Sequence, residues 1–227
     1  MRRRQFLAVG ATATTVGTAG CFGDDGYPTE TFEGTDVPLA PLEDVYEWYE
    51  DDDARFVDTR TQIEYDDLHI AGAVYSPAEH GLEADDPTEE WSTDARIVTY
   101  CICPHTLAGL RAASLIDDGY EDVYALDEGL QAWYEEGYPM EGEEVQGRLP
   151  AYDVRGEADP AHAGEFVWVR EPETGQREPG TIEEDGSYEL TLHFSELTEE
   201  TVLELEAPDY TRELTLAELT DGVVTAE

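Results

Sequence analysis

Apolar and polar positions divide the chain into two parts with different periods. Between residues 39 and 140, short apolar runs alternate with amphipathic segments. Residues 96–100 give the clearest strand pattern, and residues 107–116 repeat apolar side chains at the spacing of a helix that packs on a sheet. Strands that alternate with helices in this way predict an α/β domain with a mostly parallel central sheet flanked by helices.

The remaining elements of residues 39–140 follow from the same pattern. Residues 42–49 and the segment from Leu130 predict helices. Short apolar runs at residues 55–58, 71–75 and 123–126 predict further strands.

After residue 151 the apolar period changes to two. Strands are predicted at residues 166–169, 188–192, 202–205 and 213–216. Turn residues separate these runs, so residues 151–227 are expected to form a small antiparallel β-sandwich behind a polar linker at 141–150. We identify no chemistry in this domain and expect a spacer or binding role there, with a protein as the possible partner.

The first residues have the composition of a targeting signal. Residues 1–20 hold three arginines, no acid and a short apolar stretch, which is typical of a signal peptide. Residues 3–7 (RRQFL) resemble a twin-arginine export motif, and residues 18–21 (TAGC) resemble a lipobox that would place a lipid on Cys21. Residues 21–38 are expected to form a flexible acidic linker. We therefore expect an exported protein that is attached to the outer face of the cell membrane through its lipid alone. An ordinary signal with a chance cysteine is the alternative.

Charge excludes several classes of partner. The 227 residues include 12 arginines, no lysine and 55 acids, for a formal charge of −43. Such a chain lacks the basic footprint of nucleic-acid binding and of attachment to anionic lipid. Hydrophobic residues make up 40% of the chain and aromatic residues 10%, enough for a core. The charge therefore indicates a protein of strong brine rather than a disordered one.

One predicted strand ends in a cysteine. Cys101 follows the strand at 96–100 and precedes a loop and a helix. Backbone N–H groups of such a loop can converge on the sulfur, and the helix dipole favours an anion there. Both effects would favour the nucleophilic thiolate. A buried structural cysteine is the alternative.

Segments on either side of Cys101 resemble the rhodanese family. The first signature is matched by residues 56–60 (FVDTR), 64–65 and 69–73 (HIAGA), and the last by residues 119–133 and 137–139. Cys101 lies where that family places its catalytic cysteine. The resemblance implies a cysteine that takes a sulfane sulfur from a small donor as a persulfide and passes it to a thiol acceptor, without a cofactor. The residues expected to maintain this fold are Asp58, His69, Gly72, Gly129 and Trp133.

The active loop departs from the family in its charge. Rhodanese loops commonly carry an arginine that holds the anionic donor, whereas residues 101–108 contain neither Arg nor Lys. His105 could supply charge only when protonated. The residues expected around the substrate are Ile102, Pro104, His105, Thr106, Leu107, Ala108, Arg60 and Arg111.

A second thiol leaves the choice of nucleophile open. Counting from the strand end selects Cys101, and counting back from Ala112 and Ala113 selects Cys103. Cys103 could instead resolve the persulfide or fill space before Pro104. A metal site is not expected, because Cys101, Cys103 and His105 lack a fourth ligand.

Two functions remain. The first is a sulfurtransferase of the thiosulfate or 3-mercaptopyruvate class. The second is a non-catalytic rhodanese module for partner binding or thiol redox sensing. An oxyanion-processing activity, as in phosphatases or arsenate reductases, is disfavoured because such loops carry an arginine clamp.

Overall fold

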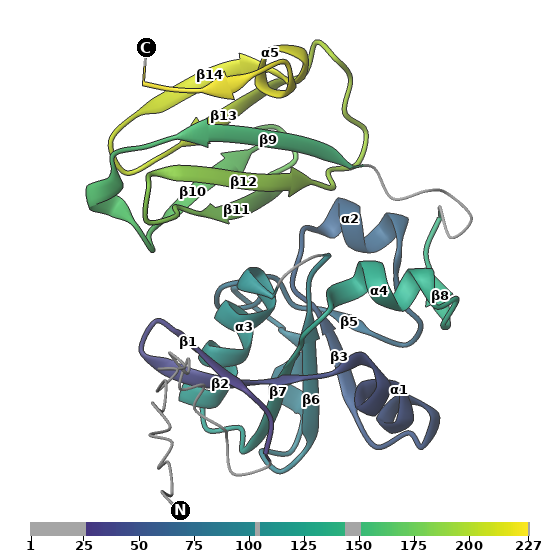
Figure 1. Ribbon diagram of the computed structural model, residues 1–227. Helices are drawn as coiled ribbons and strands as arrows, with labels where there is room; N and C mark the ends of the chain where they lie inside the picture. Colours follow the sequence, from purple (N-terminus) through teal and green to yellow (C-terminus); the bar gives the residue numbers. More distant parts are fainter. Residues whose placement is uncertain (1–25, 103–104, 144–150, 227) are drawn as a thin grey trace, which may run out of the picture.

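The computed structural model describes residues 26–102, 105–143 and 151–226. The signal segment, Cys21, Cys103, Pro104 and linker residues 144–150 lie outside this range. Two units follow one another along the chain (Figure 1): an α/β unit from β1 to β8 and a β unit from β9 to β15. No helix in the described part is both long and apolar enough to cross a membrane.

A six-stranded sheet forms the centre of the α/β unit. Its order is β1-β2-β7-β6-β3-β5, and every neighbouring pair except β1–β2 is parallel. The strands are β1 (Thr29–Phe32), β2 (Thr35–Ala40), β3 (Arg55–Asp58), β5 (Val74–Tyr75), β6 (Arg96–Tyr100) and β7 (Asp122–Leu126). The predicted mostly parallel sheet is thus confirmed, although the strand expected at 71–75 begins only at Val74.

Helices cover both faces of this sheet. The helices are α1 (Leu42–Glu50), α2 (Gln62–Asp67), α3 (Thr106–Asp117), α4 (Gly129–Glu135) and the short 3-10 helix η1 (Pro87–Glu90). On one face α3 packs with Ile97 in one apolar cluster. On the other face Val45 of α1 and Trp133 of α4 pack with Val98. Because both faces are buried, residues 97–98 of β6 and 123–126 of β7 are apolar on both sides of the sheet.

The segment before α1 differs from the flexible linker expected at 21–38. Residues 29–40 form the hairpin β1–β2, whose turn is Glu33-Gly34, with φ values of 50° and 95°. Phe32 is buried against α3, where its ring would overlap any side chain at Gly109. Within the expected linker the hairpin has only two apolar residues, Phe32 and Val37, among acids and threonines, which was too weak a pattern to predict it.

Two antiparallel sheets form most of the β unit. One has the order β11-β10-β13-β14 and the other β12-β9-β15, and a single apolar cluster contains residues from both. The elements are β9 (Tyr152–Glu157), η2 (Pro160–His162), β10 (Phe166–Arg170), β11 (Arg177–Thr181), β12 (Ser187–Leu192), β13 (Val202–Glu206), β14 (Thr211–Thr215), α5 (Leu216–Thr220) and β15 (Val223–Val224). The pair β9–β15 is parallel, and Leu216 begins α5 instead of ending a strand.

Two short strands complete the α/β unit. β4 (His69–Ile70) pairs antiparallel with β8 (Met140–Glu141). This pairing ties the end of the α/β unit to the segment that follows α2, so the chain leaves the unit close to α2 and α4 (Figure 1).

Candidate functional site

Cys101 stands directly after β6, at the carboxyl edge of the parallel sheet. Its residue is 2% exposed, and the backbone N–H groups of Leu107 and Ala108 donate hydrogen bonds to its sulfur. These two groups belong to the first turn of α3, where helix N–H groups have no partner within the helix. The predicted cradle of backbone donors is therefore present around this thiol.

A second helix holds the carbonyl groups of the same loop. The N–H of Leu130 donates to the carbonyl oxygen of Cys101 at 2.8 Å, and the N–H of Gln131 donates to that of Ile102 at 3.1 Å. Gly129, which precedes them, has φ of 72°, and a Cβ there would lie 2.8 Å from the Ile102 carbonyl oxygen. The close approach of α4 to the loop thus requires a residue without a side chain.

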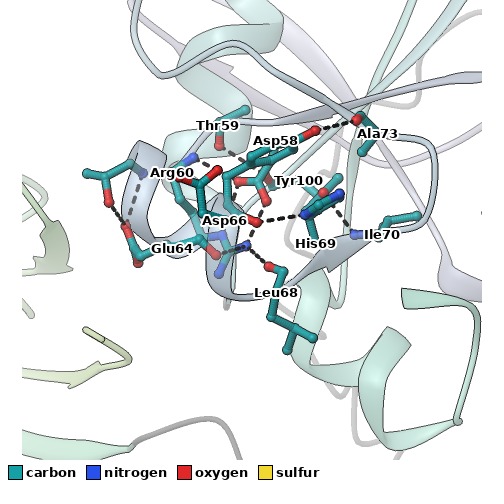
Figure 2. Close-up of polar contacts among 12 residues, drawn as sticks. Asp58, Thr59, Arg60, Glu64, Asp66, Leu68, His69, Ile70, Ala73 and Tyr100 are labelled. Atoms are coloured by element: carbon teal, nitrogen blue, oxygen red, sulfur yellow. Dashed lines mark hydrogen bonds and ion pairs between the residues drawn. The ribbon is translucent and has the colours of Figure 1, made fainter. Parts of the chain in front are cut away.

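A buried ion pair supports the loop from β3. The Arg60 guanidinium lies 2.6 Å from Asp58 Oδ2 and donates to the carbonyl oxygen of Leu68 at 2.5 Å (Figure 2). Thr59, which lies between Asp58 and Arg60 in the chain, donates through its N–H and hydroxyl to the carbonyl oxygen of Tyr100, at 3.1 and 3.0 Å. The network therefore fixes the peptide unit that leads into Cys101.

Arg111, which was expected to bind the substrate, binds other residues of the α/β unit and does not line the cavity at Cys101. It is 2% exposed, and its guanidinium donates to Ser76 at 2.9 Å and to Thr88 at 3.1 Å, with Asp86 at 3.4 Å. Desolvation by burial lowers the pKa of Arg111, and the nearby Asp86 carboxylate partly offsets this. These contacts give Arg111 a structural role, and we withdraw its assignment to the substrate.

His105 pairs with an acid of the β1–β2 hairpin. Its Nε2 lies 2.6 Å from Glu30 Oε2, and its Nδ1 lies 3.2 Å from the carbonyl oxygen of Asp127. Burial disfavours the charged imidazole and is the largest single effect, but the hydrogen bonds to Glu30 and to the Asp127 carbonyl, together with the charges of both acids, outweigh it and raise the pKa of His105. The positive charge of a protonated His105, which the sequence analysis assigned to substrate binding, is thus largely neutralised by Glu30.

The remaining predicted residues fall into two groups. Thr106 and Leu107 line the site, whereas Ile102 is fully buried in the apolar cluster on the opposite face of the sheet. Ile102 is therefore a core residue and not a substrate contact. The ring of Trp133 is fully buried in the same cluster.

The other signature residues act on the backbone around α2. His69 stacks on Tyr65 with 3.9 Å between ring centroids, and its Nδ1 lies 2.6 Å from the Tyr65 carbonyl oxygen. Gly72 has φ of 80° in the turn before β5. Both stabilise local structure and lie outside the described lining of the cavity at Cys101.

A cavity of about 710 Å³ opens at Cys101 and lies between the two units. Its walls from the α/β unit are Glu30, Cys101, His105, Thr106, Leu107 and Gln131. The opposite wall comes from β9, β11, β12 and adjoining residues, and includes Glu178 and His193. The β unit, for which no chemistry was identified from sequence, therefore forms one side of the site.

Glu178 is the acid whose charge acts on the pKa of Cys101. It is 4% exposed, and its Oε1 has no hydrogen-bond partner in the described part of the chain. Desolvation raises its pKa well above the usual value, and the charge of Glu64 acts in the same direction. Desolvation also raises the pKa of Cys101 to about 12, with the Glu178 carboxylate as the next cause. The cavity thus pairs a poorly ionised thiol with a basic carboxylate.

Arg177, beside Glu178, attaches β11 to the α/β unit. Its guanidinium donates to the carbonyl oxygen of Ala78 at 2.8 Å and lies 3.6 Å from Glu79 Oε1. The same guanidinium lies 5.3 Å from the ring centroid of Trp168, which packs against the apolar cluster of α3. These contacts hold the two walls of the cavity together.

Comparison with known families decides the class of the first unit. Residues 41–136 match the family model of the rhodanese-like domain. This segment is a rhodanese-like domain. The match covers the whole parallel sheet from α1 onward and includes Cys101, whereas the β1–β2 hairpin and the β unit lie outside it.

Curated relatives of the rhodanese-like domain carry the name tRNA uridine(34) hydroxylase. The protein of Staphylococcus carnosus is 32% identical over 130 residues, which is 54% of this chain and 39% of the relative. That of Streptococcus gordonii is 30% identical over 153 residues, or 64% of this chain and 44% of the relative. The chain therefore spans less than half the length of these relatives.

Solved structures with similarity to the chain include other rhodanese-like domains. The rhodanese-like domain of an Anabaena protein is 26% identical and covers 50% of this chain and 84% of its own, with a TM-score of 0.43. A protein of Bacillus halodurans is 26% identical, with 47% and 77% coverage and a TM-score of 0.42.

Sequence reasoning missed the whole wall from the β unit, including Glu178, and missed Glu30 in the α/β unit. Glu178 lies on β11, whose Pro179 and Gly180 hide the strand pattern. Proline is tolerated there because β11 is the edge strand of its sheet. Glu30 lies in the hairpin that the sequence predicted as linker.

Proposed function

We propose that the rhodanese-like domain is a sulfurtransferase in which Cys101 accepts a sulfane sulfur as a persulfide and passes it to a thiol. The observation that carries this proposal is the set of N–H groups from Leu107 and Ala108 that donate to the Cys101 sulfur. Such donors stabilise negative charge on a thiolate or on a terminal persulfide sulfur. The cavity of about 710 Å³ has room for a small donor such as thiosulfate or 3-mercaptopyruvate.

The tRNA hydroxylation named for the relatives is not part of this proposal. A chain with 12 arginines and 55 acids repels a polyphosphate backbone. The relatives are also more than twice as long as the aligned segment. The shared segment supports a common rhodanese-like domain and not a common substrate.

The proposal extends to where the protein works. The signal-like residues 1–20 and the lipobox-like cysteine at position 21 support export and attachment to the outer face of the membrane through a lipid. The formal charge of −43 supports work in strong salt, which would also screen repulsion between the protein and an anionic donor.

Mass spectrometry of the purified full chain in molar salt tests the sulfurtransferase. After exposure to thiosulfate or to 3-mercaptopyruvate, Cys101 should gain one sulfur atom, and a small thiol should then remove it. Cys101→Ala should abolish the gain, while Cys103→Ala should retain it. A gain that persists in Cys101→Ala but is lost in Cys103→Ala would transfer the role to Cys103. No gain at either thiol would overturn the proposal.

A non-catalytic thiol sensor is the second candidate, and one observation favours it. Burial and the Glu178 carboxylate raise the pKa of Cys101 to about 12, which disfavours a free thiolate. A sensor would show no turnover with either donor but a reversible change of Cys101 oxidation state with a mild oxidant. Catalytic turnover that depends on Cys101 would exclude this reading.

A further inference from the structure

The β unit places an unpaired carboxyl group in the cavity of Cys101. Glu178 is 4% exposed, and its Oε1 accepts no hydrogen bond from any described residue. A buried polar atom without a partner destabilises a fold, so a structure that keeps one has a reason beyond stability. The carboxyl group lines the same cavity as the thiol and contributes to its electrostatics.

Other groups in the cavity are less suited to take the thiol proton. His105 and Glu30, from the rhodanese-like domain, hydrogen bond to each other at 2.6 Å. From the β unit, Asp153, Glu183 and Glu189 line the cavity but are exposed to solvent, unlike the buried Glu178. Among the described residues of that wall, His193 is the other buried titratable group and the competing proton acceptor.

We propose that Glu178 accepts the proton of the Cys101 thiol and returns it to the leaving group of the sulfur donor. This inference rests on the proposed sulfurtransferase function and assigns its acid–base residue to the second unit. The rhodanese-like domain supplies the nucleophile and its N–H donors, and β11 supplies the proton acceptor. Arg177 holds β11 in place through the carbonyl oxygen of Ala78.

The step balances without an external oxidant. The Sγ–H bond of Cys101 breaks and its proton passes to the Glu178 carboxylate. The thiolate attacks the outer sulfur of thiosulfate, so an Sγ–S bond forms while the S–S bond of the donor breaks. Sulfite leaves with the electron pair of that bond and takes the proton back from Glu178 as hydrogen sulfite. Cys101 is left as the persulfide anion, facing the N–H groups of Leu107 and Ala108.

The electrostatic surroundings suit this exchange. Burial raises the pKa of Glu178 well above its usual value, which makes its carboxylate a stronger base than an exposed one. Charged groups that act on Glu178 are Glu64, which raises its pKa, and Arg60, which lowers it. With Cys101 and His193, these groups will shape the pH profile of the reaction.

Single-turnover persulfide formation with thiosulfate, followed across pH in the full-length protein, tests the proposal. Glu178→Gln should slow the step at neutral pH by about 10²-fold or more. The wild-type rate should rise as the Glu178 carboxyl ionises, and the variant should lose that rise. Glu178→Asp should recover part of the rate. Glu184→Gln is the matched control, because it removes an exposed charge of the same unit outside the cavity lining, and should leave the rate unchanged.

The opposite result would overturn the proposal. If Glu178 only repels the thiolate, Glu178→Gln lowers the pKa of Cys101 and the rate at neutral pH rises. A loss confined to His193→Gln would also overturn it, by moving the base to His193. Alkylation of Cys101 by iodoacetamide, which needs no sulfur donor, separates this inference from the proposed function. If wild-type Cys101 takes no sulfur but Glu178→Gln slows its alkylation, the proton acceptor stands and the sulfurtransferase fails.

Discussion

The guanidinium of Arg177 in β11 donates a hydrogen bond to the carbonyl oxygen of Ala78 in the rhodanese-like domain, with 2.8 Å between the heavy atoms. The contact joins two units that differ in class and lie far apart in sequence. It stands one residue before Glu178, so the position of the carboxyl group beside Cys101 depends on how firmly β11 is docked.

Arg177→Met should weaken that docking while keeping most of the apolar stem. Loss of a partly buried, charged donor is expected to cost about 1–3 kcal/mol in the free energy of unfolding. Urea unfolding in molar salt measures it. Arg155→Met is the control, because Arg155 pairs at 3.1 Å with exposed Glu189 within the β unit, and such pairs contribute little. Equal losses in both variants would contradict a docking role for Arg177.

Glu30→Gln should lower the pKa of His105. Burial lowers the His105 pKa, but the hydrogen bonds and charges of Glu30 and Asp127 together outweigh it and raise the pKa in the folded chain, while the hydrogen bond from His105 lowers the pKa of Glu30. The Glu30–His105 pair therefore stabilises the fold most at a pH between the ordinary pKa of a Glu side chain and that of a His side chain. The contribution is lost as pH rises through the raised value of His105 and as pH falls through the lowered value of Glu30.

NMR titration of the His105 ring measures this shift. Glu33→Gln removes an exposed acid from the turn of the same hairpin and should leave the titration in place. An unchanged His105 titration in Glu30→Gln would show that the hairpin acid does not control this histidine.

Gly129→Ala should destabilise the active loop. The backbone has φ of 72°, and the added Cβ would lie 2.8 Å from the Ile102 carbonyl oxygen. Gly119→Ala is the matched control, since Gly119 has φ of 99° with open space around a Cβ. The control should lose about 1–3 kcal/mol from backbone strain, and Gly129→Ala should lose more. Thermal unfolding of both variants compares them, and equal losses would show that the close approach of α4 carries no cost.

Arg60→Met should be among the most damaging single changes to the rhodanese-like domain. It would leave the Asp58 carboxylate buried without its ion-pair partner, 2.6 Å away in the wild type. Removing one member of a buried pair typically costs about 3–5 kcal/mol. The double variant with Asp58→Asn should recover part of the loss. Denaturant unfolding gives both values, and a double variant that is less stable than the sum of the single losses would contradict this account.

Sequence patterns predicted the parallel sheet well because its strands are buried on both faces. Residues 97–98 and 123–126 are continuous apolar runs, and helices α1, α3 and α4 start close to the predicted positions. The predicted position of Cys101 at a strand end follows from the same regularity. The N–H cradle around its sulfur is a general property of a helix start, so it too could be expected.

The other half of the site could not be predicted in this way. Pro179 and Gly180 interrupt the apolar period of β11, so the sequence predicts this strand poorly. A period of apolar residues also does not show which unit a strand faces. Burial of Glu178 arises from contacts between the two units, which no local pattern encodes. Arg111 and Arg60 were candidates by proximity in sequence, but the network around Asp86 and Asp58 uses them instead.

Cys101 is only 2% exposed, and this burial determines which molecules can reach its thiol. A sulfur that is covered on one side by α3 and faced on the other by the β unit is shielded from the disulfides of other folded proteins. A mixed disulfide requires direct contact between two sulfur atoms, so this arrangement should slow its formation with such proteins. The same shielding acts as a size filter, because a bulky folded acceptor cannot enter the chamber whereas a small thiol or a slender chain end can.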